Sequence, residues 1–113
     1  MTELSAKSEP EACEAIPAED MLARATEAAG FMKALAHEGR MMILCHLSAG
    51  EKTVTELENL LGQRQAAVSQ QLARLRAEGL VSCRRQGKAR LYSIADPRAA
   101  EVVGLMYRLF CAG

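Results

Sequence analysis

The sequence has no tryptophan, and aromatic residues make up only 4% of its 113 residues. A core in this chain therefore has to be filled by aliphatic side chains, alanine and the six methionines. No apolar run approaches the roughly 18 residues that span a membrane. The N-terminus has neither the cationic leader nor the apolar stretch of a secretion signal. We therefore expect a cytoplasmic protein without a membrane partner.

An overall excess of basic charge, which is common in DNA-binding proteins, is also missing, because 14 basic and 14 acidic residues cancel. The charges are nevertheless separated along the chain. Residues 1–20 hold six acidic residues against the single Lys7, a net charge of −5. The other 93 residues carry 13 bases and eight acids, a net charge of +5. We expect residues 1–18 to be an acidic, disordered tail and residues 19–113 to form one domain.

The middle of the chain has the pattern of two short helices joined by a turn. Thr53-Val54-Thr55-Glu56 is a capping box, and apolar residues recur after it at helical spacing. Gly62-Gln63 interrupts this pattern. A second helix is predicted from Arg64 to Glu78, with Gly79 at its end, where glycine readily adopts a left-handed conformation. The pair has the spacing of a helix-turn-helix.

Two β segments, Leu80–Gln86 and Ala89–Ile94, follow the helix pair and are joined across Gly87-Lys88. A helix-turn-helix followed by a hairpin is the arrangement of a winged DNA-binding domain. The fold class expected is therefore mainly α with a two-stranded β-hairpin wing.

Further helices are predicted on both sides of this unit. Apolar residues at helical spacing indicate helices over residues 19–36 and from Gly39 to Ser48. A last helix begins with Asp96 as N-cap and Pro97 in the first turn, and extends to Phe110. It is apolar on more than one face, which is more than a terminal helix can bury within its own subunit. We therefore expect a homodimer formed by the first and last helices.

Major-groove recognition requires a helix whose exposed N-terminal half carries short hydrogen-bonding side chains. The second helix of the predicted pair has such residues opposite its apolar stripe of Val68, Leu72 and Leu75. The residues predicted to contact base edges are Gln65, Ala66, Ser69 and Gln70. Double-stranded DNA is therefore the expected partner.

Basic side chains flank this surface and predict contacts to phosphates or to the minor groove. They are Arg64 and Arg74 on the helix and Arg84, Arg85, Lys88 and Arg90 on the hairpin. The alternative is a solvated charged hairpin with no ligand, which is the ordinary explanation of an isolated run of charges. Beside a helix-turn-helix, the DNA-binding interpretation is preferred.

The segments Leu35–Arg40, Val68–Leu75, Glu78–Val81 and Arg84–Lys88 resemble the ArsR family of small dimeric winged-helix repressors. The resemblance covers about residues 19–111. It implies a repressor that binds a pseudo-palindromic operator and is released from it by a chemical inducer.

Many members of this family sense metals, and the chain departs from their patterns. The metal-binding type has cysteines at the start of the helix that here reads Thr53–Asn59, where this sequence has none. The other common site uses Asp and His along the last helix, but residues 97–113 contain neither. No two cysteines have Cys-x-x-Cys spacing. We expect no bound metal and no cofactor, with a metal- or metalloid-sensing repressor as an alternative.

Four cysteines are present, and in a reducing cytoplasm they need not form disulfides. Cys13 lies in the tail, and Cys83 lies on the first predicted strand, where we expect a small buried side chain. Taken singly, Cys45 and Cys111 fit inert core residues. As a pair, in the second and last helices, they resemble the thiols of sulfide-responsive ArsR repressors of the SqrR and BigR type. The resemblance implies that both react with persulfides, become bridged through sulfur and release DNA.

Helix geometry suggests how such a pair would select its inducer. A direct disulfide needs Cα atoms about 4.4–6.8 Å apart, whereas the axes of packed helices lie about 8–10 Å apart. Two thiols on rigid helices are then better joined by a longer bridge, to which a persulfide contributes sulfur. Our hypothesis is that persulfide closes the bridge more readily than peroxide.

Other functions remain open from the sequence. A repressor with an oxidant-driven disulfide switch is the nearest of them. An enzyme, such as a thiol oxidoreductase or a sulfurtransferase, would need a Cys-x-x-Cys pair or a nucleophile in an anion-binding loop, and the sequence has neither. A plain interaction module would explain the apolar last helix but not the cationic hairpin.

Overall fold

The computed structural model describes residues 16–112. The predicted disorder of the acidic tail and the position of Cys13 lie outside the described residues. The chain divides into two compact units, residues 1–33 and residues 34–113, and each is considered by itself.

The described part of the first unit is the helix α2, Ala18–Leu35, whose last two residues belong to the second unit. The helix predicted over residues 19–36 is therefore confirmed, with a shift of one residue at each end. Glu19 and Asp20 lie in its first turn and Lys33 in its last. These charges are favourable because they oppose the partial charges at the two ends of a helix.

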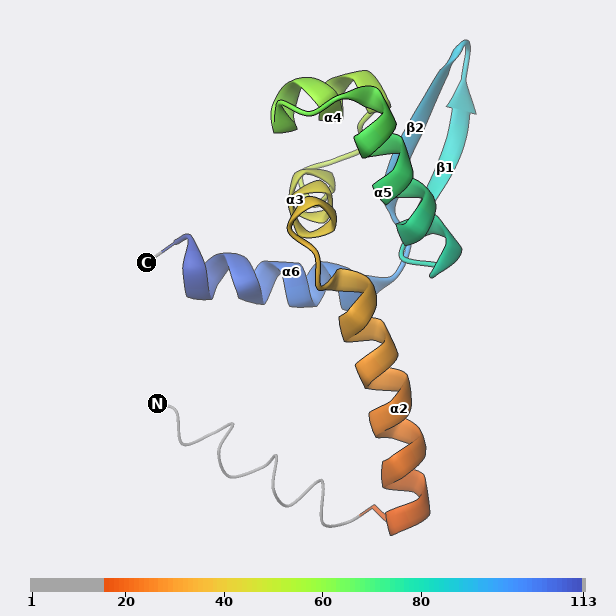
Figure 1. The fold of residues 1–113 in the computed structure, drawn as a ribbon, viewed down its shortest axis with the longest axis vertical. Helices are drawn as coiled ribbons and strands as arrows, with labels where there is room; N and C mark the ends of the chain where they lie inside the picture. The colour runs from red at the N-terminus through yellow and green to blue at the C-terminus, as the bar shows by residue number, and fades with distance from the viewer. Residues whose placement is uncertain (1–15, 113) are drawn as a thin grey trace. The chain divides into compact units, whose positions relative to one another are not determined.

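The second unit is built around α3, which contacts every other helix of the unit as well as the second strand of the hairpin. In Figure 1, α3 lies between α6 on one side and the α4–α5 pair on the other. The elements of this unit are α3 (Glu38–Leu47), α4 (Val54–Leu61), α5 (Gln65–Ala77), β1 (Val81–Gln86), β2 (Ala89–Ile94) and α6 (Pro97–Phe110). The predicted winged helix-turn-helix is confirmed.

The core of the unit consists of aliphatic side chains, as the scarcity of aromatic residues requires. Ile43, Leu44 and Leu47 of α3 are at most 4% exposed. Burying each such side chain contributes about 1.5–3 kcal/mol. The buried hydrophobic residues of the other parts of this unit include Leu57, Val68, Leu72, Leu75, Leu80, Val81, Ala99 and Val103.

The start of α3 is fixed by a histidine cap. The Nδ1 atom of His37 accepts a hydrogen bond from the Gly39 N–H at 3.0 Å. A Cβ atom at position 39 would lie 3.2 Å from this imidazole ring. Glycine therefore allows the ring to close tightly over the first turn of the helix.

The helix-turn-helix is delimited by two local hydrogen-bond motifs. At the start of α4, Thr53 Oγ1 accepts from the Glu56 N–H at 3.1 Å, and Glu56 Oε1 accepts from the Thr53 N–H at 2.8 Å. The predicted capping box is confirmed. At the end of α5, Gly79 has φ +78°, and the Leu80 N–H donates to the Leu75 carbonyl at 2.9 Å. This is the glycine-dependent termination expected from the sequence.

The wing is a two-stranded antiparallel hairpin in which Val81 pairs with Ile94 and Gln86 pairs with Ala89. Its two-residue loop places Gly87 at φ +63°, a conformation that costs glycine little. An isolated bridge pairs Lys52 with Tyr92, so the segment before α4 lies along the outer edge of β2.

The first strand was expected to begin at Leu80, and it begins one residue later. The Leu80 N–H is used to close α5, as described above, and the Leu80 carbonyl accepts from the Ala95 N–H at 2.8 Å. The side chain of Leu80 is only 2% exposed. Leu80 is thus a core residue that links the helix-turn-helix to the wing.

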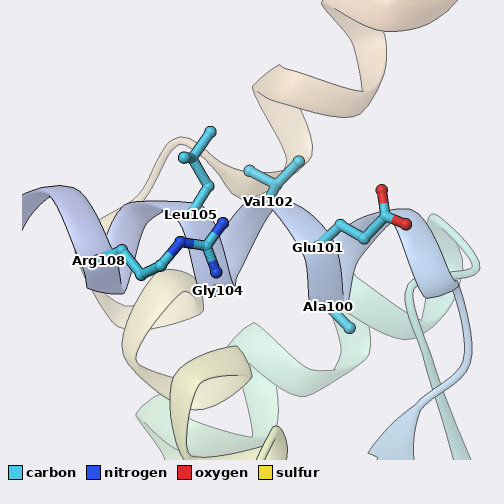
Figure 2. Close-up of a pocket in the computed structure, with 6 residues that line it drawn as sticks. All are labelled: Ala100, Glu101, Val102, Gly104, Leu105 and Arg108. Atoms are coloured by element: carbon cyan, nitrogen blue, oxygen red, sulfur yellow. The ribbon is translucent and has the colours of Figure 1, made fainter. Parts of the chain in front are cut away.

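The last helix begins as predicted, because Asp96 Oδ1 accepts from the Arg98 N–H at 2.9 Å and Pro97 occupies the first turn. One side of α6 buries Ala99 and Val103. Figure 2 shows another side, where Leu105 and Arg108 lie beside Gly104 around a shallow hollow. The large apolar side chains of α6 that stay exposed are Leu105 (41%), Tyr107 (51%), Leu109 (62%) and Phe110 (79%). The helix therefore has apolar surface that the single chain leaves uncovered.

Within residues 16–112, no helix is long and apolar enough to cross a membrane.

We expect Thr53→Ala to lower the free energy of unfolding by about 1 kcal/mol, because an amide at the start of α4 loses its acceptor. Urea denaturation measures this loss. Thr55→Ala is the matched control, since Thr55 is exposed inside the same helix and alanine is the better helix former. Equal losses in the two variants would contradict the role assigned to the cap.

Candidate functional site

The exposed side of α5 carries the residues predicted to read DNA. Val68, Leu72 and Leu75 hold the other side of the helix in the core, at no more than 1% exposure. The four predicted base-reading residues, Gln65, Ala66, Ser69 and Gln70, are consequently all exposed in the first two turns. The arrangement suits a recognition helix.

The two arginines predicted to flank this surface differ in their surroundings. Arg64 precedes the helix as its N-cap residue, rather than forming the first helical residue as expected, and its side chain makes no cap hydrogen bond. Arg74 pairs with Glu78 one turn later, with 3.3 Å between Nε and Oε2. An exposed pair of this kind contributes only a few tenths of a kcal/mol, so a phosphate can compete for Arg74.

A buried arginine ties the recognition helix to the start of α3. Arg40 is 9% exposed, and its Nε donates to the Ala34 carbonyl at 2.6 Å. Its Nη1 atom donates to Gln71 Oε1 on α5 at 3.0 Å. The hydrogen bond between Arg40 and Gln71, which helps to position α5, was not predicted from the sequence. The available signal was a cationic residue at the start of an otherwise apolar helical segment.

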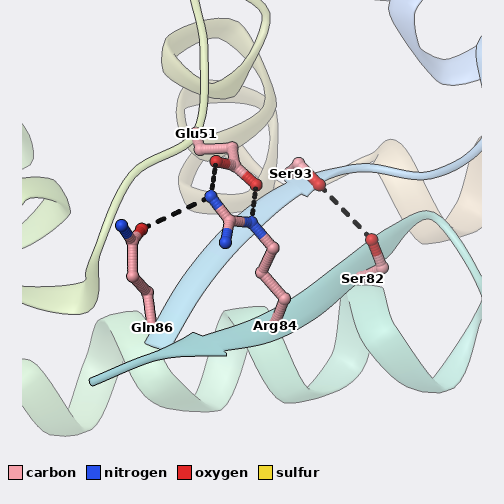
Figure 3. A network of polar contacts seen from close by, with 5 residues as sticks. All are labelled: Glu51, Ser82, Arg84, Gln86 and Ser93. Carbon is pink, nitrogen blue, oxygen red and sulfur yellow. Dashed lines mark hydrogen bonds and ion pairs between the residues drawn. The ribbon is translucent and has the colours of Figure 1, made fainter. Parts of the chain in front are cut away.

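The cationic residues of the wing are all exposed, but one of them is engaged within the chain. Arg84 Nε donates to Glu51 Oε2, and Arg84 Nη2 donates to Glu51 Oε1, each at 2.8 Å (Figure 3). Glu51 lies in the segment before α4, 33 residues from Arg84 in the sequence, so the run of cations on the hairpin did not reveal this partner. The other predicted wing residues, Arg85, Lys88 and Arg90, are exposed on the same hairpin.

The bidentate pair shifts the ionisation of both partners. Hydrogen bonding between Arg84 and Glu51 lowers the pKa of the Glu51 carboxyl and raises the pKa of the Arg84 guanidinium. A lowered folded-state pKa means that the pair contributes to stability at neutral pH and is lost as the pH falls through that lowered value. Both side chains are exposed, at 36% for Glu51 and 55% for Arg84, so the contribution is small.

Cys83 is half-buried, so the buried side chain expected from the sequence is only partly buried. It lies directly opposite Tyr92 in the hairpin register, and both side chains are partly buried. Burial raises the pKa of Tyr92, and the neighbouring Cys83 raises it further. The position assigns Cys83 no function.

The structure brings Cys45 and Cys111 to one pocket. Cys45 lies on α3, and Cys111 is the C-cap residue of α6. Both are free thiols and both are exposed, so neither is the inert core residue that each would be expected to be if taken singly. The pocket has a volume of about 320 Å³, and its lining is Met41, Met42, Cys45, Val103, Met106, Tyr107, Phe110 and Cys111.

Helical spacing explains why these residues converge. Met41 and Met42 lie one turn before Cys45, and Tyr107 lies one turn before Cys111. The Cys111 N–H donates to the Tyr107 carbonyl at 2.8 Å, which keeps the last thiol in register with α6. The pocket therefore forms where the outer sides of two contacting helices, α3 and α6, meet. In the part of the chain that is described, no three His, Cys, Asp or Glu residues are grouped to hold a metal ion.

A helix-turn-helix with an exposed polar recognition helix and a cationic wing defines a winged-helix DNA-binding regulator. Comparison with known proteins agrees. The pattern described as "Bacterial regulatory protein, arsR family" matches residues 37–82. The chain is 45% identical over 97 residues to the biofilm growth-associated repressor of Agrobacterium fabrum, covering 86% of this chain and 83% of that protein. The chain belongs to the ArsR family of bacterial regulatory proteins.

Solved structures show the same fold. The repressor BigR from Xylella fastidiosa is 43% identical, with a TM-score of 0.77 over 85% of this chain and 95% of that one. Reduced HlyU from Vibrio cholerae is 35% identical, with a TM-score of 0.79 over 82% of this chain and 98% of that one. These relatives are transcriptional regulators, so the enzyme alternative is excluded.

Glu51→Gln should strengthen binding to operator DNA selected from a random pool, because it releases Arg84 for a phosphate. We expect the plot of log affinity against log salt concentration to steepen by up to about one unit. Fluorescence anisotropy at several salt concentrations measures both effects.

Glu101→Gln is the control for the Arg84 experiment, since it removes the same charge from exposed surface on α6. An equal gain in both variants would mean that net charge alone acts, and that Glu51 does not restrain the wing.

Proposed function

We propose that the chain is a dimeric transcriptional repressor that leaves its operator when Cys45 and Cys111 react with persulfides. The observation that carries this proposal is that Cys45 and Cys111 both line one pocket. Repression is supported by the names of the relatives from Agrobacterium fabrum and Xylella fastidiosa, which are 45% and 44% identical and are called repressors. The relative HlyU of Vibrio cholerae, 36% identical, is called a transcriptional activator.

The chemistry needs no reagent other than the persulfide, written RSSH. One thiol takes the outer sulfur of a first RSSH and releases RSH. The new protein persulfide attacks the R-bearing sulfur of a second RSSH and displaces H₂S. The other thiol then displaces RSH and closes a bridge with one added sulfur atom. The protein thiols are oxidised, the persulfide is reduced, and atoms and electrons balance.

Bridge length is the basis of the selectivity that we propose. The thiols lie on different helices that contact each other, and packed helices keep their axes about 8–10 Å apart. A direct disulfide requires Cα atoms about 4.4–6.8 Å apart. A bridge with added sulfur spans a longer gap without moving either helix. Persulfide is therefore proposed to act more readily than peroxide.

Release of DNA would follow from the position of α3. This helix contacts both α6, which holds Cys111, and α5, which carries the predicted base-reading residues. Bridging α3 to α6 fixes their spacing, and a dimer must match half-sites about one DNA turn apart. A coupling of about 1–3 kcal/mol would weaken operator binding about 5- to 150-fold, so a small shift is sufficient.

A homodimer is supported by the apolar surface of α2 and α6, the first and last helices of residues 16–112, which these residues leave exposed. On α6, Leu109 and Phe110 are 62% and 79% exposed. On α2, Leu22 and Met32 are 69% and 49% exposed. A two-fold dimer covers such residues with the same residues of a second copy, and it binds a pseudo-palindromic operator.

An oxidant-driven disulfide switch is the second candidate. It is favoured by one observation, which is that both thiols of the pocket are exposed to a dissolved oxidant. The two candidates differ in the mass of the product. A disulfide loses two hydrogens, whereas a sulfur bridge also gains sulfur.

The proposal is tested by measuring operator affinity and intact mass for reduced, peroxide-treated and persulfide-treated protein. In the unmodified chain, persulfide should add sulfur with loss of two hydrogens and weaken binding about 5- to 150-fold. Cys45→Ser and Cys111→Ser should bind DNA as the reduced protein does and lose the response, because no bridge can close.

Cys83→Ser is the matched control, since its thiol lies on the wing and not in the pocket. It should keep the full response. Release by peroxide as effective as release by persulfide would overturn the selectivity, and a response retained in both pocket variants would overturn the proposal.

Leu109→Glu should raise the dimer dissociation constant by at least about 100-fold, because burying an unpaired carboxylate costs several kcal/mol. Sedimentation equilibrium measures it. Leu60→Glu on α4 is the control, since Leu60 is 49% exposed and lies outside α2 and α6. A dimer unchanged by Leu109→Glu would place the interface elsewhere.

A further inference from the structure

We propose that the pocket of Cys45 and Cys111 also binds a soft monovalent metal ion, Cu(I). The ion would be held by the two cysteine thiolates together with methionine thioethers from the pocket wall. The proposal uses the pocket described above but does not depend on sulfur sensing, and either can fail while the other holds.

The pocket gathers sulfur atoms from residues that are scattered along the chain. Three of the six methionines, Met41, Met42 and Met106, line it together with two of the four cysteines. On α3, both methionines lie one turn before Cys45, so all three side chains share a side of the helix. Met106 and Cys111 are supplied by the end of α6. Five sulfur-bearing side chains thus surround one cavity.

The kinds of ligand present favour Cu(I) over the common divalent ions. The other lining residues are Val103, Tyr107 and Phe110, and none of the eight is a histidine or a carboxylate. Zn²⁺ takes four nitrogen, oxygen or thiolate ligands, which this wall does not provide. Thiolate and thioether sulfur select Cu(I), which also accepts fewer ligands.

Charge and size fit the same ion. One thiolate with Cu(I) is neutral, which suits the largely apolar pocket, and the remaining positions can be filled by uncharged thioethers. A second thiolate makes the complex anionic, but both cysteines are exposed, so water can solvate that charge. A cavity of about 320 Å³ holds a single ion with room for its ligands.

Binding is an exchange of ligands and involves no electron transfer. Each cysteine releases one proton to solvent as its thiolate binds, and copper remains Cu(I) throughout. A thiolate that holds the metal is not free to attack a persulfide. Metal and sulfur bridge should therefore exclude each other.

The test is an anaerobic titration of the reduced full-length protein with Cu(I) against a chromophoric Cu(I) chelator. We expect one ion per chain and an X-ray absorption spectrum with sulfur as the only nearest neighbour. Cys45→Ser and Cys111→Ser should each weaken binding by more than roughly 100-fold, because loss of even an outer-shell partner costs about 10- to 100-fold. Cys83→Ser is the matched thiol control, since Cys83 lies on β1 and does not line the pocket, and it should bind as the unmodified chain does.

The thioethers are tested by Met106→Leu and Met42→Leu, which keep size and apolar character but remove sulfur. We expect about a tenfold loss of Cu(I) affinity in at least one of them. Met32→Leu on α2 is the control and should show none. Unchanged operator binding by the metal-free variants establishes that they are folded.

Three results would overturn the proposal. They are affinity in Cys45→Ser and Cys111→Ser within threefold of the unmodified chain, nitrogen or oxygen as the nearest neighbours of copper, or displacement of Cu(I) by equimolar Zn²⁺. Intact mass after persulfide treatment is read on the same samples. It reports the proposed function separately, because sulfur addition can persist in a protein that does not bind copper.

Discussion

The packing of α3 at the centre of the second unit is the constraint on which the other features depend. Ile43, Leu44 and Leu47 are almost completely excluded from water, and the helix that carries them contacts α4, α5, α6 and the β2 strand of the wing. Close-packed protein interiors do not deform continuously. A change in the seating of α3 is therefore passed to its neighbours. The same helix carries one proposed sensing thiol, Cys45, on its exposed side, and it contacts α5, which carries the predicted base-reading residues.

Two polar connections set the orientation of the DNA-binding surface around this core. Arg40 joins the start of α3 to Gln71 on the recognition helix, and Glu51 joins the segment before α4 to Arg84 on the wing. The first is partly buried, and loss of one partner would leave the other without its hydrogen bond at a cost of about 1–3 kcal/mol. The second is exposed and weak. The predicted recognition helix α5 is thus held by the stronger connection, while the weak pair leaves Arg84 available for the phosphate contact predicted from the sequence.

Local chemistry explains why so much of the fold could be predicted. Helix and strand boundaries were right to about one residue, because caps and turns use partners only a few positions away, as Thr53 does with Glu56. Contacts between distant segments were not predictable in this way. Arg84 and Glu51 are 33 residues apart, and nothing in either neighbourhood identifies the other. The half-burial of Cys83 was missed for a related reason, since the exposure of a strand residue depends on what covers the sheet.

The sequence by itself determined the order of the helices, the turn and the wing, and the exposed side of α5, because each is encoded in short-range patterns of apolar and capping residues. The family of regulators was indicated separately, by the resemblance of particular segments of the chain. The sequence also supplied Cys45 and Cys111 as a pair by resemblance. Only the tertiary structure decided that these thiols open into one cavity with three methionines, and that Arg84 already has a carboxylate partner. Such groupings depend on how helices and loops pack across long stretches of chain. That packing results from burying the whole core together, and no local segment specifies it.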